Sequence, residues 1–170
     1  MIFAVSLKLF MLKNIFTSLM LLLSGLLYGQ GQTPALNQKI IDYVNTQIGK
    51  KIDRGECWDL AYEALTRNNC EWDGKYAYGK KLNPKTDSIY PGDLLQFEDV
   101  TIKYQENNVI YKELYPHHTA IIYKVIAKGD YKIAHQNFGN IGRKVGITEL
   151  KLSGKLSGSI YFYRPVAKTE

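Results

Sequence analysis

The order of the two kinds of predicted secondary structure is the feature that most limits how this chain can fold. Between residues 34 and 69, apolar residues recur at the three- and four-residue spacing of amphipathic helices. From residue 70 onward, β-branched and aromatic runs are separated by Gly, Pro and Asn, which is typical of strands joined by turns. Helices followed by an antiparallel sheet predict an α+β domain.

Two helices are expected before the sheet, at residues 34–49 and from Cys57 to about Asn68. The apolar stripe of the second helix starts with Cys57, so this side chain is expected to point inward at the N-terminus of that helix. The expected strands are 93–97, 101–104, 109–113, 119–126, 131–136 and 159–164, with a weaker one at 145–151.

Residues 1–29 differ from the rest of the chain. Lys8 and Lys13 precede an apolar run at residues 19–27 that ends in small residues near Gly29. The run is too short to span a bilayer, and the pattern predicts a secretory signal peptide. A buried N-terminal helix is the alternative, although such a helix normally has a polar face. We therefore expect one domain at residues 30–170, a secreted or periplasmic location, and no stable membrane anchor after cleavage.

The charge distribution gives no sign of a nucleic-acid partner. The net charge of +6 falls to +4 without residues 1–29, because that segment holds two lysines and no acidic residue. The remaining Lys and Arg residues are scattered, with no run dense enough for a nucleic-acid interface. We expect a monomer.

The two cysteines of an exported protein suggest a disulfide first. If Cys57 starts a helix that runs to about Asn68, Cys70 lies roughly 18 to 20 Å from it, because a helix rises about 1.5 Å per residue. A disulfide needs Cα atoms about 4.4 to 6.8 Å apart. The helical reading therefore disfavours a bridge between Cys57 and Cys70, which stays open as an alternative.

The histidines cluster around one predicted hairpin. A loop at residues 127–130 pairs Ile126 with Tyr131, which puts His118, His135 and Asn137 on one face and turns His117 to the other face. A loop of two residues keeps these faces, whereas a loop of three residues reverses them.

Cys57 and the residues of that face have the chemistry of a thiol nucleophile and its base. The dipole of a helix and a neighbouring imidazole both favour the thiolate. His118 would accept the thiol proton, and His135 or Asn137 would orient the imidazole. The same residues have other uses, because Cys57, His118 and His135 could bind zinc, and inward cysteines and histidines are often core residues.

Four segments resemble the cysteine, histidine-dependent amidohydrolase/peptidase (CHAP) family and the related NlpC-like cell-wall cysteine peptidases. They are GECWDLAYEAL, YPGDLLQF, HTAIIYKV and HQNFG, at residues 55–65, 90–97, 118–125 and 135–139. The resemblance implies a papain-like fold, with N-terminal helices packed against an antiparallel sheet. It also implies the roles of nucleophile for Cys57, base for His118 and orienting residue for Asn137. His135 stands where the family often has a glutamate.

The resemblance implies a secreted thiol hydrolase that cleaves amide bonds in peptidoglycan without a metal or organic cofactor. Peptidoglycan, or another polymer that contains amides, would be the partner. His117 is the competing candidate for the base, and Asp93 is expected to be structural. A non-catalytic extracellular binding module of the same fold is the alternative function.

Overall fold

The computed structural model describes residues 32–169, and the predicted signal peptide lies outside them. The described residues from Thr33 onward belong to one compact unit. Its helices are α2 (Ala35–Gln47) and α3 (Asp59–Arg67), with short 3-10 helices η1 (Gly139–Ile141) and η2 (Leu152–Gly154). Its strands are β1 (Lys80–Leu82), β2 (Leu94–Glu106), β3 (Val109–Ala127), β4 (Asp130–His135), β5 (Gly146–Lys151) and β6 (Lys155–Arg164).

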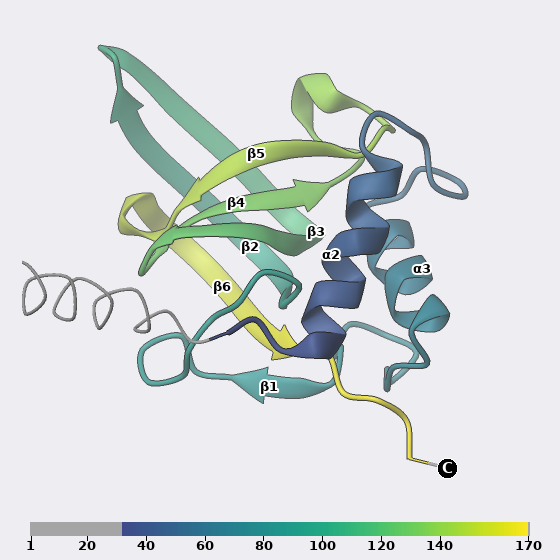
Figure 1. Ribbon diagram of the computed structural model, residues 1–170. Coiled ribbons are helices and arrows are strands. Elements are labelled where there is room, and N and C mark those ends of the chain that lie inside the picture. Colours follow the sequence, from purple (N-terminus) through teal and green to yellow (C-terminus); the bar gives the residue numbers. More distant parts are fainter. Residues whose placement is uncertain (1–31, 170) are drawn as a thin grey trace, which may run out of the picture. The chain divides into compact units, whose positions relative to one another are not determined.

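The strands form one six-stranded sheet in the order β1-β6-β2-β3-β4-β5, and all neighbouring strands are antiparallel. Figure 1 shows α2 and α3 together on one side of this sheet. The two helices and the antiparallel sheet agree with the sequence-based prediction. The predicted strands at 101–104 and 109–113 are the outer parts of β2 and β3, and β1 was not predicted.

The sheet has an apolar core on each face because both faces of its central strands are apolar. The helix-side core joins α2 and α3 to one face of the sheet; its members include Ile40, Val44, Leu60, Ala64, Leu94, Ile121, Ala134 and Tyr163. The second core lies on the other face; its members include Leu95, Phe97, Ala120, Ile122, Ile133, Tyr131 and Phe162. Successive residues of a strand point to opposite faces, so neighbours such as Leu94 and Leu95 belong to different cores.

Curvature of the sheet encloses the second core. The rings of Tyr131 in β4 and Phe162 in β6 lie 6.1 Å apart, although two strands separate β4 from β6 within the sheet. Lys151 in β5 similarly places its Nζ atom 5.3 Å from the centre of the Tyr104 ring in β2. The sheet therefore folds over its own inner face and needs no helix there.

The alternation of side chains reverses once along the β2–β3 hairpin. Phe97 and Val100 both belong to the second core, although they are three residues apart. The pairing of β2 with β3 skips Asp99 and Pro116 at this point, and Asp99 has a φ of 52°. As a result, the face to which a side chain points changes between the inner and outer parts of the hairpin.

Asp93, which directly precedes β2, connects this strand to α2 and β6. Its buried carboxylate accepts hydrogen bonds from Asn37 Nδ2 at 2.8 Å and from the backbone N–H of Tyr90 at 2.9 Å. It also pairs with Arg164, whose Nη2 atom is 2.9 Å away. These partners are structural, in keeping with the role expected for Asp93. No helix among residues 32–169 is long and apolar enough to cross a membrane.

Candidate functional site

Cys57 lies in the turn that precedes α3, two residues before the helix begins. The helix was predicted to start at Cys57, but Asp59 starts it and stabilises the turn, because Asp59 Oδ2 accepts a hydrogen bond from the backbone N–H of Glu56 at 2.8 Å. Both Cys57 and Cys70 have free thiols, so the alternative of a disulfide between them is wrong.

The thiol of Cys57 lies beside the backbone of Thr119 in β3 and near Tyr78 of the helix-side core. Burial raises its pKa above the usual value, and this effect outweighs a hydrogen bond with the backbone of Thr119, which lowers it. The nearby carboxylate of Glu56 raises the thiol pKa further. A thiol at a helix N-terminus was expected to have a lowered pKa because of the helix dipole. The structure gives the opposite direction because desolvation disfavours the charged thiolate.

His118 and His135 form a buried pair inside the second core. His118 Nε2 lies 2.9 Å from His135 Nδ1, and His135 Nε2 lies 3.0 Å from the hydroxyl oxygen of Thr148. The rings of His118 contact those of Phe97, Tyr115 and Phe138. Burial lowers the pKa of His118 to about 4 and that of His135 to about 3. Both imidazoles are therefore neutral at neutral pH.

The sheet separates this histidine pair from Cys57. The thiol contacts Thr119, whose hydroxyl lies 2.9 Å from the hydroxyl of Tyr78 in the helix-side core. His118, the residue directly before Thr119, points to the second core. The structure therefore does not form the expected pair of Cys57 as nucleophile and His118 as base.

The hairpin that carries the histidines explains which part of the prediction was correct. Its turn is Lys128-Gly129, with Ala127 paired with Asp130, and the register shifts twice before Ile122 pairs with Ile133. Two shifts of one residue restore the alternation, so His118 and His135 share a face as predicted. The error was to pair Cys57 with the residues of that face.

Asn137 is not part of the histidine pair. It follows β4 with a φ of 59°, and its Nδ2 atom donates a hydrogen bond to Glu56 Oε2 at 3.0 Å. The predicted orienting residue therefore binds the loop that precedes α3 and not the imidazole of His118. Beside it, the buried Gln136 donates from Nε2 to the carbonyl oxygens of Ile52 and Glu56 at 3.1 and 2.8 Å. These bonds attach the loop that carries Cys57 to the sheet.

His117 occupies the same face of the sheet as Cys57. Its Nδ1 atom lies 2.8 Å from Glu98 Oε2, and its ring contacts the edge of Tyr76 with centroids 4.2 Å apart. Gln96 joins this pair to the cysteine side, because its amide donates to Glu98 Oε1 at 2.9 Å and its Oε1 accepts from Thr119 Oγ1 at 2.7 Å.

Tyr78, Gln96, Glu98 and Thr119 are polar residues of this network that the sequence analysis did not identify as site residues. The only sequence signal for this network was the spacing of His117 and Thr119, which are two residues apart along a strand and therefore share a face. Among residues 32–169, no group of three or more His, Cys, Asp or Glu side chains is arranged to hold a metal ion. The zinc alternative of the sequence analysis needs Cys57 beside the histidine pair, which the sheet prevents.

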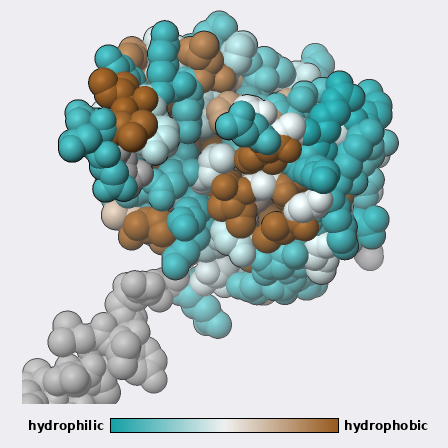
Figure 2. Space-filling view, turned by 90° about the horizontal axis from the view of Figure 1, so that it is seen from above, coloured by the Kyte–Doolittle hydropathy of each residue, from teal (hydrophilic) through white to brown (hydrophobic). Residues whose placement is uncertain are grey.

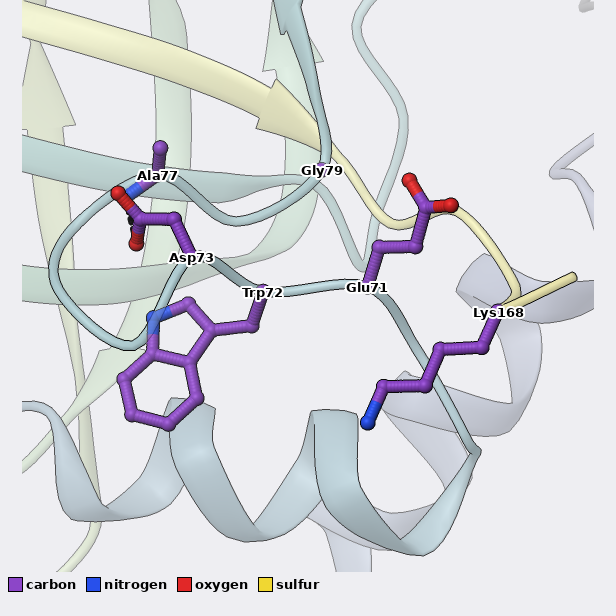
Figure 3. A pocket seen from close by; sticks show the side chains of 6 residues that line it. All are labelled: Glu71, Trp72, Asp73, Ala77, Gly79 and Lys168. Atoms are coloured by element: carbon purple, nitrogen blue, oxygen red, sulfur yellow. Dashed lines mark hydrogen bonds between the residues drawn. The ribbon is translucent and has the colours of Figure 1, made fainter.

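A hollow of about 400 Å³ opens beside an aromatic cluster at α3. Trp72 packs against Trp58 and Tyr62, with ring centroids 5.9 and 5.2 Å apart. Figure 3 shows the indole of Trp72 beside the hollow, with the side chains of Glu71 and Lys168 on its other side.

Comparison with known proteins identifies the domain. Residues 33–169 match the family described as the AIM3/BBC1 Cysteine proteinase-fold domain. The protein "Altered inheritance of mitochondria protein 3" of Debaryomyces hansenii is 26% identical over 150 residues, which cover 75% of this chain and 15% of that protein. The chain thus spans about a seventh of its curated relative.

One solved structure, titled "The crystal structure of Ly7917", has a TM-score of 0.45 at 15% identity, and the match covers 75% of this chain and 62% of that chain. A likeness of this degree has no bearing on function.

These matches correct the functional prediction. The relative is a protein of a yeast, and its name refers to the inheritance of mitochondria, so the prediction of a secreted peptidoglycan hydrolase with peptidoglycan as its partner was wrong. The relative also gives no support to a signal peptide, and the location of the protein stays a prediction. The resemblance to cysteine peptidases was correct at the level of the fold. The chain belongs to the AIM3/BBC1 cysteine proteinase-fold domain family.

Proposed function

We propose that this domain is a non-catalytic interaction module that uses a cysteine-proteinase fold as a scaffold. The position of Cys57 carries this proposal, because the sheet separates its thiol from the histidine pair. A cysteine nucleophile needs a base within hydrogen-bonding reach of its sulfur. Among the described residues, the hydrogen bonds of His118 and His135 go to each other and to Thr148.

The ionisation of the three groups supports the same proposal. Burial raises the pKa of the Cys57 thiol, so the thiol form dominates at neutral pH. The lowered pKa values of His118 and His135 keep both rings uncharged, and neither can stabilise a thiolate as an imidazolium. The name of the D. hansenii relative describes no catalysed reaction.

The finer prediction of a cysteine amidohydrolase or peptidase of the CHAP type would need a different base. His117 is on the correct face, and its contact with Glu98 resembles the support that a catalytic imidazole receives from a carboxylate. However, His117 is exposed, and none of the hydrogen bonds among residues 32–169 joins it to Cys57. The experiment below distinguishes this possibility from an inert thiol.

The test measures how fast iodoacetamide alkylates each cysteine between about pH 6 and pH 10, with mass spectrometry to separate Cys57 from Cys70. We expect slow labelling of Cys57 at neutral pH, with a rate that rises only in the alkaline range. His117→Ala and His118→Ala should leave this profile unchanged. A neutral-pH rate that is fast in the wild type and falls by about tenfold or more in either variant would overturn the proposal. Lys39→Ala on the exposed face of α2 is the control.

A further inference from the structure

The outer part of the β2–β3 hairpin, residues 100–115, extends beyond the strands that flank it; we call it the arm. The pairing of β2 with β6 ends at Ile102 and Lys155, and β3 pairs with β4 only from Ile121 onward. The edge of β3 from Val109 to Tyr115 therefore has no strand beside it among the described residues. Figure 1 shows the arm as the teal hairpin that projects away from the sheet.

The two faces of the arm differ in what covers them. On the inner face, the Tyr104 ring stacks on Tyr111 at 5.1 Å and lies under Lys151 of β5. Residues of β3 between these inner positions face outward, and Ile110 and Leu114 are 61% and 55% exposed there. Figure 2 looks down on the end of the molecule from which the arm projects and shows apolar patches among hydrophilic side chains.

The same outer face carries positive charge. Lys103 lies directly opposite Lys112 in the ladder of β2 and β3. None of the ion pairs among residues 32–169 includes either of these two lysines. Like charges opposite each other destabilise a strand pair. A carboxylate placed beside Lys112 would relieve this repulsion.

We propose that the arm binds an extended acidic segment of a partner protein, which adds to the free edge of β3 as a new strand. Opposite residues of paired strands share a face, so the partner residues next to Ile110, Lys112 and Leu114 would all lie on the outer face. The matching pattern is an apolar residue, an acidic residue and an apolar residue at every second position. This inference rests on the proposed function and assigns the binding surface and the class of partner.

The exposed backbone of the arm distinguishes this partner from a lipid surface. Unpaired N–H and C=O groups find no hydrogen-bond partner in hydrocarbon, so an arm with a free edge is unsuited to insertion into a bilayer. A partner strand satisfies these groups and supplies main-chain hydrogen bonds in addition to side-chain contacts.

The charge of the arm also disfavours a second copy of this chain. If two copies of the chain paired antiparallel along residues 109–115, their two-fold axis would pass through the middle residue of this edge, Lys112. The Lys112 side chains of the two copies would then lie opposite each other and repel.

The probe is a synthetic peptide of about eight residues with the core Val-Thr-Glu-Thr-Val, and the control peptide has Lys in place of Glu. Binding to the full chain is measured by calorimetry at low salt, and amide hydrogen exchange is followed by NMR. We expect the Glu peptide to bind and to slow exchange in residues 109–115.

The variant Lys103→Glu/Lys112→Glu should weaken binding by about tenfold and should favour the Lys peptide. Lys39→Glu/Lys80→Glu, on exposed lysines away from the arm, is the matched control and should bind as the wild type does.

The variant Ile110→Asn/Leu114→Asn tests the apolar part of the surface separately and should also weaken binding of the Glu peptide. Equal binding of both peptides, protection elsewhere in the chain, or unaltered binding by the arm variants would overturn the inference. Binding to vesicles of anionic lipid that displaces the peptide, or dimerisation of the free chain through the arm, would also overturn it. If the peptide does not bind and Cys57 is inert to alkylation, only the assignment of the arm is wrong. If Cys57 is reactive and this reactivity depends on His117, the proposed function is wrong.

Discussion

His118 Nε2 lies 2.9 Å from His135 Nδ1 inside the second core, on the face of the sheet opposite to Cys57. The two neutral rings share one hydrogen bond, and Thr148 takes part at the far side of His135. The pair therefore fills and orders the interior of the curved sheet, and its chemistry is linked to the stability of the fold.

This linkage predicts that the protein loses stability in mild acid. Both histidines have lowered pKa values in the folded state, at about 4 and about 3, whereas an unfolded histidine titrates near about 6.5. The unfolded chain thus binds more protons between these values, so the contribution is complete above about pH 6.5 and is lost as the pH falls. We expect the free energy of unfolding in urea to fall by about 4 kcal/mol from about pH 7 to about pH 5.

The histidine variants test the source of this pH dependence. His135→Gln removes one of the two titrating groups and should make the decrease shallower, whereas Lys39→Gln should not change it. An equally steep decrease in His135→Gln would show that other groups cause the acid sensitivity.

The ion pair of Asp93 and Arg164 should contribute strongly to stability because the carboxylate is fully buried. Asp93→Asn leaves the guanidinium without its counter-charge, and removing one partner of a buried pair costs about 3 to 5 kcal/mol. Arg67→Gln removes an exposed pair with Glu63 within α3 and should cost less than about 1 kcal/mol. Equal losses in the two variants, measured by chemical denaturation, would contradict this assignment.

Gly92 should not tolerate a side chain. Its φ is 85°, and a Cβ atom at this position would collide with the backbone carbonyl of Asn37 in α2. Gly74 has a similar φ of 78° but no atom within 4 Å of the added Cβ, so Gly74→Ala isolates the cost of the backbone conformation. We expect about 1 kcal/mol for Gly74→Ala and at least about 3 kcal/mol for Gly92→Ala in thermal or chemical unfolding. Similar costs at both positions would mean that α2 moves away freely.

Gln136 should control access to Cys57. Its side chain exchanges hydrogen bonds with the backbone of Ile52 and donates one to the carbonyl of Glu56, which fixes the loop before α3. Gln136→Leu removes these bonds and leaves buried backbone groups unsatisfied, at a cost of about 2 kcal/mol. The loosened loop should expose the thiol, so alkylation of Cys57 should accelerate while that of Cys70 stays constant. A variant that loses stability without faster labelling would contradict this role.

The alternation of residues in β3 and β4 correctly predicted that His118 and His135 share a face, even though the predicted loop was too long. The two register shifts between the turn and Ile122 cancel, so the alternation survived an error in the pairing. The extent of α3 was less predictable from the pattern. Cys57 lies in the apolar stripe, but the bond from Glu56 N–H to Asp59 makes the chain turn before the helix begins.

The sequence by itself determined the order of helices and strands and the shared face of His118 and His135, because both follow from local periodicity. Only the tertiary structure decided that α2 and α3 cover the opposite face and that the thiol of Cys57 meets Thr119 instead of an imidazole. The physical reason is that β3 is apolar on both faces, with Ile121 in one core and Ile122 in the other. A pattern of this kind shows which side chains lie together, but the packing of distant elements determines what they face.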